Sequence, residues 1–268
     1  MPEIILITGG TSGLGLAMAQ SLAEKGNIVY ASGRHLPDNS PYKNLFFKTL
    51  DVTKKETIET AIKDIIHEHN RIDVLINSAG IGAAAPLEEI SIEEVQDVFN
   101  INLFGILRTI QQVIPVMRKN RKGMIINVSS IGGQTGLPFQ GVYSSTKFAL
   151  EGMTEALSIE LKPFGIHVCL LEPGDYNTNV LHNRKVVKPA PDSPYSERLA
   201  LFFDLLNNNI KQGRHPDKIK KLVARIVNSK RPKLRYKSGK LFEIITPAAQ
   251  RLMPDRLFER IITGFYKL

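Results

Sequence analysis

Short apolar runs alternate with longer stretches of helical periodicity through the first two thirds of the chain. The apolar runs lie at 4–8, 28–32, 45–50, 73–77, 123–129 and 166–172, and the helical stretches lie at 13–25, 54–69, 91–118 and 143–162. Apolar strands separated by helices are typical of a parallel sheet that is covered by helices on both faces. The pattern therefore predicts an α/β fold with a doubly wound parallel sheet.

Two of the helical stretches begin with a hydroxyl residue followed three positions later by glutamate. These pairs are Thr53 with Glu56 and Ser91 with Glu94. In such a capping box the hydroxyl and the carboxylate each accept a hydrogen bond from a backbone N–H that the helix leaves without a partner. We expect both helices to begin in this way.

The regular alternation of short apolar runs and helical stretches ends at about residue 179. The remainder contains the apolar segment 199–206, basic helical segments and a strand-like run at 233–237. These pieces are too short to bury a core alone, so residues 1–268 are expected to form a single domain with a C-terminal helical cap. Residues 1–180 would hold the core, and 181–268 a substrate loop and the basic cap.

Composition describes a globular protein with an uneven charge distribution. The chain has 268 residues, of which 43% are apolar and 23% charged, and a net charge of +9. Residues 1–180 hold 15 Lys and Arg against 19 Asp and Glu, while 181–268 hold 20 against 7. The excess of positive charge thus lies in the last third of the chain. No pattern of aromatic and basic residues typical of nucleic-acid recognition accompanies it, which argues against nucleic-acid binding.

The cysteine content and the lengths of the apolar runs indicate where in the cell the protein is expected. A lone cysteine, Cys169, excludes an internal disulfide, and no secretory signal or bilayer-spanning run of about 20 apolar residues is evident. We expect a cytoplasmic protein. The basic, amphipathic C-terminal segment suggests either peripheral contact with an anionic membrane or simply the solvated face of a capping helix.

The first strand-like run leads directly into the turn "TGGTSGLG" at 8–15, and a helical stretch follows. Glycines at 9, 13 and 15 allow a sharp turn and close approach of a pyrophosphate, which the N–H groups of the helix N-terminus would bind. This context predicts a Rossmann-type dinucleotide site. The second run ends in "YASGRH" without an acid, and Arg34 there favours the 2′-phosphate of NADP(H).

The sequence resembles the short-chain dehydrogenase/reductase family. The shared pieces, in the family's order, are "TGGTSGLG", "DV" at 51, "NSAG" at 77–80, "NLFG" at 102–105, "INVSS" at 126–130, Tyr143 with Lys147, and "PGDYNT" at 173–178. Ser78 stands where many members have a second asparagine. The segments "EPGDYNTN" and "RYKSGK" are similar to the steroid- and retinoid-reducing branch. The resemblance implies cofactor contacts by Gly9, Thr11, Ser12, Gly13, Leu14, Gly15, Arg34, Asp51, Val52, Asn77, Ala79, Gly80, Tyr143, Lys147, Pro173, Gly174 and Thr178.

Reduction of a carbonyl needs a proton donor beside the hydride donor. Tyrosine has a pKa of about 10, and an ammonium group four residues along a helix lowers it by stabilising tyrosinate. Tyr143 and Lys147 have this spacing. The resemblance further implies that Lys147 binds the nicotinamide ribose, that Ser130 stabilises the substrate oxygen and that Asn102 holds a water in a proton relay. Thr178 would orient the nicotinamide.

We therefore expect an NADP(H)-dependent oxidoreductase that interconverts a carbonyl and an alcohol, on a lipophilic substrate such as a steroid, a retinoid or a long-chain ketone. The alternatives are a non-catalytic dinucleotide-binding regulator and a nucleotide-sugar epimerase or dehydratase.

No metal is expected, since His67 and His69 lack a ligand cluster. Apolar side chains in excess on 91–118 and 143–162 suggest a homodimer or homotetramer. The apolar segment 199–206 fits both a pocket lid and the buried face of a helix, with Leu201, Phe202, Phe203 and Leu206 as wall candidates.

Overall fold

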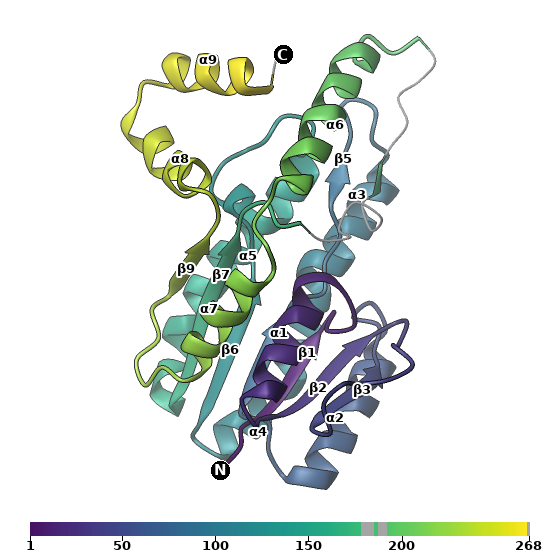
Figure 1. Cartoon of the computed structure of the whole chain (residues 1–268), viewed down its shortest axis with the longest axis vertical. Coiled ribbons are helices and arrows are strands. Elements are labelled where there is room, and N and C mark those ends of the chain that lie inside the picture. Colours follow the sequence, from purple (N-terminus) through teal and green to yellow (C-terminus); the bar gives the residue numbers. More distant parts are fainter. Residues whose placement is uncertain (178–184, 187–191, 267–268) are drawn as a thin grey trace.

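Seven parallel strands form the central sheet of the computed structural model, which describes residues 1–177, 185–186 and 192–266 (Figure 1). Their order is β3-β2-β1-β4-β6-β7-β9. The strands are β1 (Ile4–Thr8), β2 (Ile28–Gly33), β3 (Leu45–Thr49), β4 (Val74–Asn77), β6 (Gly123–Val128), β7 (Ile166–Pro173) and β9 (Arg235–Ser238). The doubly wound α/β fold is confirmed. Strand order reverses between β1 and β4, the place where such sheets bind ligands.

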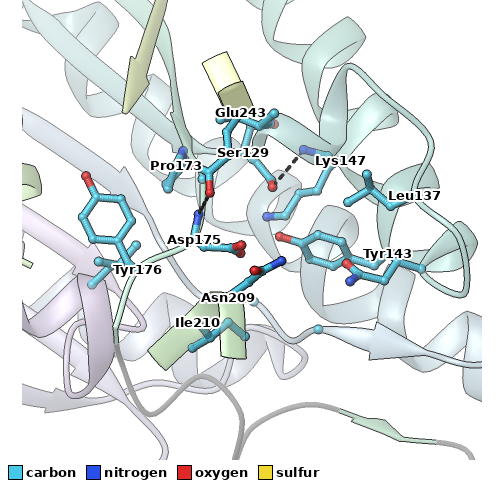
Figure 2. A pocket seen from close by; sticks show the side chains of 18 of the residues that line it. Ser129, Leu137, Tyr143, Lys147, Pro173, Asp175, Tyr176, Asn209, Ile210 and Glu243 are labelled. Atoms are coloured by element: carbon cyan, nitrogen blue, oxygen red, sulfur yellow. Dashed lines mark hydrogen bonds between the residues drawn. The ribbon is translucent and has the colours of Figure 1, made fainter. Parts of the chain in front are cut away.

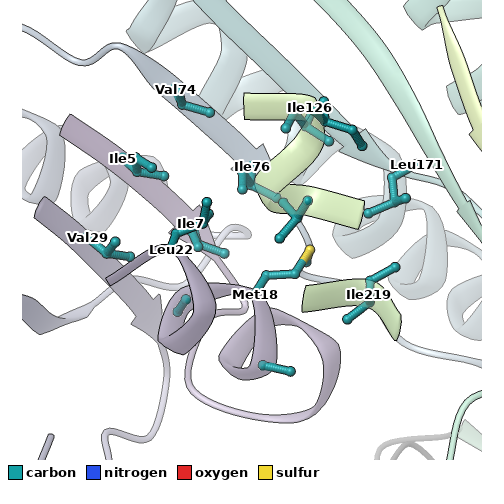
Figure 3. Close-up of a cluster of buried hydrophobic side chains, with 14 of the residues drawn as sticks. Ile5, Ile7, Met18, Leu22, Val29, Val74, Ile76, Ile126, Leu171 and Ile219 are labelled. Carbon is teal, nitrogen blue, oxygen red and sulfur yellow. The ribbon is translucent and has the colours of Figure 1, made fainter. Parts of the chain in front are cut away.

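Each face of the sheet carries its own hydrophobic layer. Alternate residues of β1 point to opposite faces, so Ile5 and Ile7 join one layer and Ile4 and Leu6 the other. The first layer is covered by α1 (Gly13–Glu24) and α7 (Asp217–Val227), as Figure 3 shows for Met18 of α1. The second is covered by α2 (Lys55–His69), α4 (Gly105–Lys119) and α5 (Gly141–Glu160).

The helical stretch expected over 91–118 is confirmed, and it contains a π-helical turn. The structure has α3 (Ile92–Phe99), a π-helical turn at Asn100–Phe104, and then α4. A π-helical turn shifts the hydrogen bonds by one residue, and such turns frequently occur at functional sites. The apolar periodicity predicted the helical stretch but not the π-helical turn, because the pattern runs on through Asn100–Phe104 without a Gly or Pro to mark a change.

Only one of the two expected capping boxes forms. Ser91 caps α3, with its side chain accepting from the Glu94 N–H and the Glu94 carboxylate accepting from the Ser91 N–H. At α2 the prediction was wrong, because the Thr53 hydroxyl instead donates to the Asp51 carboxylate at 2.7 Å. The helix begins at Lys55 without a side-chain cap.

The C-terminal part of the chain packs around the carboxyl end of the sheet. It contains α6 (Ser196–Lys211), α8 (Leu241–Leu252) and α9 (Asp255–Tyr266), and a small parallel pair is formed by β5 (Ala83–Ala84) and β8 (Lys185–Val186). In Figure 1, α6, α8 and α9 lie beyond the strand ends. The basic helix α7 buries its apolar face in the first core layer, so its charged residues form a solvated face.

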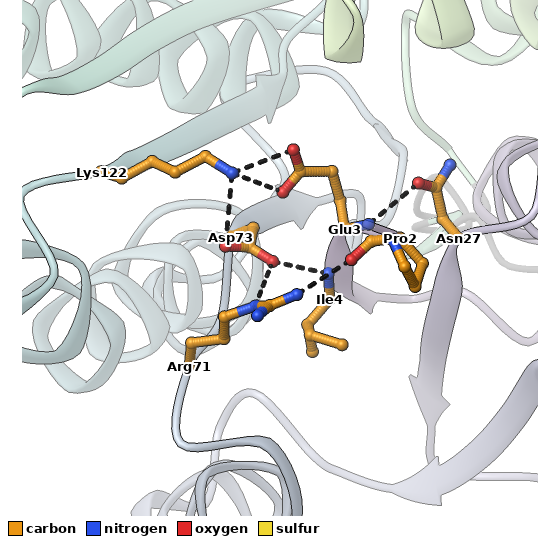
Figure 4. A network of polar contacts seen from close by, with 7 residues as sticks. All are labelled: Pro2, Glu3, Ile4, Asn27, Arg71, Asp73 and Lys122. Atoms are coloured by element: carbon orange, nitrogen blue, oxygen red, sulfur yellow. Dashed lines mark hydrogen bonds and ion pairs between the residues drawn. The ribbon is translucent and has the colours of Figure 1, made fainter.

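A network of hydrogen bonds and ion pairs connects the amino ends of the strands, at the edge of the sheet opposite to α6, α8 and α9 (Figure 4). The buried carboxylate of Asp73 accepts from the Ile4 N–H at 2.8 Å and from Arg71 Nε at 2.9 Å. Lys122 pairs with Glu3 at 2.9 Å and with Asp73 at 3.6 Å. These contacts fix the starts of β1 and β4, whose other ends border a cavity at the carboxyl edge of the sheet.

Candidate active site and cofactor cleft

A cavity of about 550 Å³ lies at the carboxyl ends of the strands. Its walls come from the turn after β1, the ends of β4, β6 and β7, the start of α5, and helices α6, α8 and α9. Of the residues predicted to bind cofactor or substrate, it brings together Gly9, Ser12, Gly13, Leu14, Gly15, Ala79, Gly80, Ser130, Tyr143, Lys147, Pro173 and Gly174. Figure 2 shows a close view of this cavity.

The glycine turn has the geometry that a pyrophosphate needs. Gly9 and Gly13 adopt positive φ angles of 64° and 53°. A Cβ on Gly9 would lie 2.7 Å from the backbone of Ala79, whereas nothing lies within 4 Å of the position of a Cβ on Gly13. Ser12 precedes α1 but makes no side-chain cap, which leaves the first N–H groups of the helix for an anion. The turn therefore fits a dinucleotide phosphate.

Arg34 follows β2 directly and is exposed at the rim of this turn. Asp51 lies within its electrostatic reach. Burial of the Asp51 carboxyl opposes ionisation, but hydrogen bonds from Thr53 and the positive charges of Arg34 and Lys54 prevail and lower its pKa. A cationic side chain and a carboxylate thus lie together where an adenosine ribose is expected.

Besides Arg34 and Asp51, three of the described residues predicted to bind the cofactor are not part of the cavity lining: Thr11, Val52 and Asn77. The Thr11 side chain packs against Gly33. Val52 is buried against Gly105. The Asn77 side chain is buried and donates to Asn127 Oδ1 at 2.9 Å, so it braces β4 against β6. Thr178 lies outside the described residues.

Tyr143 and Lys147 lie one helical turn apart on α5 and share one wall of the cavity. Lys147 Nζ lies 5.8 Å from the centre of the Tyr143 ring and donates to the carbonyl of Val128 at 2.9 Å. Burial lowers the pKa of Lys147 to about 8, although the nearby Glu151 carboxylate opposes the change. The ammonium group is therefore buried at the end of β6, within electrostatic reach of the tyrosine.

Ser130 lines the same cavity as Tyr143. It ends the β6 segment in an extended conformation, and its hydroxyl accepts from the Gly132 N–H at 3.1 Å. A Cβ placed on Gly132 would lie 3.5 Å from Ser130 Oγ and 3.7 Å from the Tyr143 ring. The two hydroxyl-bearing side chains therefore border one small space.

Asn102 is fully buried in the π-helical turn. Its Oδ1 accepts from the Ile81 N–H at 2.8 Å, and its Nδ2 donates to the Ile81 carbonyl at 2.9 Å and to Thr146 Oγ1 at 3.2 Å. Both Asn102 Oδ1 and Lys147 Nζ lie within 4 Å of a Cβ position on Gly80. The turn thus fixes this amide close to the lysine.

A buried charged cluster that the sequence did not reveal lies behind the lysine. Arg235 of β9 pairs with Glu151 at 3.0 Å and with Glu172 of β7 at 3.3 Å. Gln134 donates to Glu172 at 2.8 Å and accepts from Lys237 at 3.0 Å. Burial, and then the charge of Glu151, raises the pKa of Glu172 to about 7.

Two further polar side chains face the reaction side of the cavity. In Figure 2 the carboxylate of Asp175 and the amide of Asn209 point toward the hydroxyl of Tyr143. Asp175 belongs to the quoted segment "PGDYNT", but its side chain had no assigned role, and Asn209 lies far along the chain on α6. Of the expected wall residues in 199–206, Leu206 lines the cavity, Phe202 is buried in the core and Leu201 is exposed. As wall residues Leu201, Phe202 and Phe203 were therefore wrong, whereas Phe202 and Leu206 fit the alternative of a buried helix face.

Comparison with known proteins identifies the family. A family model described as short chain dehydrogenase matches residues 3–187. The chain belongs to the short-chain dehydrogenase family. It is 39% identical to a 3-ketodihydrosphingosine reductase of Bacteroides thetaiotaomicron over 100% of this chain and 99% of the relative. The family assignment makes this protein an oxidoreductase.

Two other relatives agree with this assignment. The chain is 32% identical to retinol dehydrogenase 8 of Bos taurus, covering 89% of this chain and 82% of the relative. A solved short-chain dehydrogenase from Streptomyces avermitilis superposes with a TM-score of 0.84 at 28% identity, over 100% of this chain and 97% of that one. The expected resemblance to the short-chain dehydrogenases, including a retinoid enzyme, is confirmed.

Proposed function

We propose that this short-chain dehydrogenase reduces the ketone of a long-chain lipid with NADPH. The observation that carries the proposal is the shared wall of Tyr143, Lys147 and Ser130 in a cavity that runs from the glycine turn into an apolar chamber. NADPH, when bound, supplies the hydride. The chain's own residues must then deliver a proton and stabilise the developing negative charge on the substrate oxygen.

Tyr143 is the proposed proton donor to that oxygen, and Ser130 donates a second hydrogen bond to it. The positive charge of Lys147 favours tyrosinate and so brings the pKa of Tyr143 closer to neutrality. Lys147 is also suited to bind ribose hydroxyls of the cofactor. Asn102, fixed beside Lys147 by the π-helical turn, is the proposed next member of a path that returns the proton.

Preference for NADP(H) rests on Arg34. The exposed guanidinium at the end of β2 suits a bidentate contact with a 2′-phosphate, and no carboxylate stands in "YASGRH" to bind a free ribose 2′-OH. Thr11, Asp51, Val52, Asn77 and Thr178 remain predicted cofactor residues.

A lipophilic substrate is supported by the outer part of the cavity. Leu137, Leu206, Ile210, Ile262 and Phe265 line it, and they come from three different parts of the chain. The names of the relatives, a 3-ketodihydrosphingosine reductase and a retinol dehydrogenase, both specify apolar substrates of some length. We therefore favour a long-chain ketone over a sugar nucleotide.

Replacement of Tyr143 by phenylalanine tests the reaction. Because Phe keeps the ring but cannot donate a proton, NADPH oxidation with a long-chain ketone should fall by at least about a hundredfold. NADPH binding, followed by fluorescence titration, should persist. Ser145→Ala is the matched control, since Ser145 lies on the same helix but is exposed. A Tyr143→Phe variant with normal turnover would refute the assignment.

We also propose that the protein is a homo-oligomer that contacts lipid surfaces. Large apolar side chains are exposed on the π-helical turn, α4 and α5, where a second subunit would cover them: Phe104, Leu107, Phe148 and Ile159.

A second exposed apolar stripe follows one face of α8, at Leu241, Ile245 and Leu252, and adjoins the cavity at Phe242. This stripe makes α8 a better candidate for membrane contact than the basic α7. None of the helices in the described residues is long and apolar enough to cross a membrane.

A further inference from the structure

Three side chains with linked chemistry follow one face of α5 at intervals of four residues: Tyr143, Lys147 and Glu151. Residues four apart on a helix lie one turn from each other on the same face. With a rise of about 1.5 Å per residue, Lys147 stands about 6 Å along the axis from each of the others, which are about 12 Å apart. Glu151 therefore acts on Tyr143 mainly through the lysine between them.

The ammonium group of Lys147 needs a negative charge nearby because it is buried. The residue is only 5% exposed, and its Nζ donates to the neutral carbonyl of Val128 at 2.9 Å. A buried cation without a counter-charge readily loses its proton. Burial lowers the pKa of Lys147 to about 8, and the charge of Glu151 opposes this change. Glu151 thus supplies the counter-charge.

Other charged side chains also line the cavity, at the end of β7 and the start of α8. They are Asp175, Lys240 and Glu243. The Glu243 carboxylate accepts from the Lys240 N–H at 2.6 Å and from the Asp175 N–H at 3.4 Å, so it joins these two elements. Of the ionisable groups in the described residues, Glu151 is the one whose charge acts on the pKa of Lys147.

The carboxylate of Glu151 is fixed by Arg235 of β9. Glu151 is 6% exposed, and its Oε2 accepts from Arg235 Nε at 3.0 Å. Arg235 also pairs with Glu172 of β7 at 3.3 Å, so one guanidinium bridges two buried carboxyls. Burial raises the pKa of Glu151, but the charge of Arg235 opposes this. Burial, and then the charge of Glu151, raises the pKa of Glu172 to about 7. Glu151, which has the shorter contact with Arg235, therefore carries the negative charge near neutral pH.

Further charged and polar groups surround this pair of carboxyls and Arg235. Gln134 donates to Glu172 at 2.8 Å and accepts from Lys237 of β9 at 3.0 Å. Glu155, one turn further along α5, pairs with Arg235, but 52% of its side-chain surface is accessible. Two cations of β9 thus belong to this cluster, which allows one of its carboxyls to stay ionised although it is buried.

We propose that Glu151, held in place by Arg235, is a positioning residue that keeps Lys147 protonated beside Tyr143. The charged lysine stabilises tyrosinate and so makes the proton of Tyr143 easier to give to the substrate oxygen. Glu151 exchanges no atom with the substrate and acts through the lysine. This role of Glu151 rests on the proposed reduction at Tyr143. It extends the reaction machinery to β9, since Glu151 and Arg235 are 84 residues apart in the chain.

The pH dependence of the reduction of a long-chain ketone by NADPH, in mixed micelles, tests this role. Reduction needs Tyr143 and Lys147 both protonated, so kcat falls at the pH where the pair loses its first proton. Removal of the negative charge makes that proton easier to lose. In Glu151→Gln, which keeps an acceptor for Arg235, the fall should therefore occur about one pH unit lower, whereas kcat at pH 6 should be nearly unchanged.

Glu155→Gln is the matched control, because Glu155 lies on the same helix and pairs with the same Arg235 but is accessible to solvent. It should keep the wild-type pH profile. Glu151→Asp keeps the carboxylate and should shift the fall in kcat by less than Glu151→Gln does. Circular dichroism spectra check that each variant folds.

NMR reads the lysine directly and needs no turnover. In protein labelled with 13C at the lysine Cε, Lys147 should titrate near pH 8, apart from the exposed lysines, and its signal is assigned by its loss in Lys147→Arg. In Glu151→Gln the midpoint should fall by about one pH unit, a tenfold weaker hold on the proton. An unchanged midpoint would overturn the role of Glu151.

The outcomes separate this role from the proposed function. If Glu151→Gln lowers kcat by the same factor at every pH, Glu151 is only structural, and its role as a counter-charge is refuted while the reductase assignment stands. If the wild type binds NADPH but reduces no long-chain ketone, the proposed function fails, and the NMR titration still decides whether Glu151 holds the proton on Lys147.

Discussion

Glu172 offers a quantitative test of the charged cluster behind Lys147. Its side chain is fully buried, and burial together with the neighbouring Glu151 raises its pKa to about 7 from an ordinary value of 4.5. The folded protein therefore holds this proton up to a higher pH than the unfolded chain does. Protonated Glu172 therefore stabilises the folded state relative to ionised Glu172. This contribution to the free energy of unfolding is complete below pH 4.5 and is lost as pH rises through about 7.

The magnitude follows from the two pKa values. The interval from 4.5 to about 7, at about 1.4 kcal/mol for each pH unit, corresponds to about 3 kcal/mol of unfolding free energy. Glu172→Gln keeps the shape and the acceptor for Gln134 but cannot ionise. Its unfolding free energy should rise relative to that of the wild type by about 2 to 3 kcal/mol between pH 5 and pH 8.

Urea unfolding followed by circular dichroism at several pH values measures this difference. Histidines and other carboxyls titrate in both proteins and cancel in the comparison. Glu155→Gln is the control, since Glu155 pairs with the same Arg235 but is about half exposed, with 52% of its side-chain surface accessible, and exposed ion pairs contribute little. Parallel stability curves for Glu172→Gln and wild type would show that Glu172 ionises in its ordinary range, and the reasoning would be wrong.

Four other substitutions test separate features. Gly9→Ala should weaken NADPH binding at least tenfold in a fluorescence titration, because the new Cβ would lie 2.7 Å from the Ala79 backbone at a positive φ. Arg34→Ala should raise KM for NADPH about tenfold and leave KM for NADH unchanged; an equal effect on both would exclude a 2′-phosphate contact. Phe202→Ala should lower the unfolding free energy by about 3 to 5 kcal/mol in urea, because Phe202 is fully buried. Ile245→Glu should reduce co-sedimentation with anionic vesicles without changing the circular dichroism spectrum; unchanged sedimentation would refute lipid contact by α8.

The strands and the glycine turn could be predicted from the sequence for a simple physical reason. A strand buried on both faces is predominantly apolar, so a run such as 4–8 stands out from its surroundings. Parallel strands also carry their carboxyl ends to one edge, which is why motifs distant in sequence, such as Gly9 and Tyr143, line one cavity.

Features that depend on tertiary packing could not be predicted. The direction of α6 decides that Asn209 faces Asp175, and no local pattern encodes that direction. The pairing of β9 with β7 likewise decides that Arg235 meets Glu172. The capping box at Thr53 failed because a neighbouring carboxylate, Asp51, was the stronger partner for its hydroxyl.

The pairing of β9 with β7 has a consequence for synthesis of the chain. Residues 173 and 238 are neighbours in the sheet but 65 residues apart in the sequence, an interval that a ribosome covers in about 3 to 13 seconds. Throughout that interval the apolar strand β7 has one open edge, which is a template for association with other chains. The nascent protein therefore exposes this edge until β9 has been made, and a chain cut short before Arg235 would keep the edge open permanently.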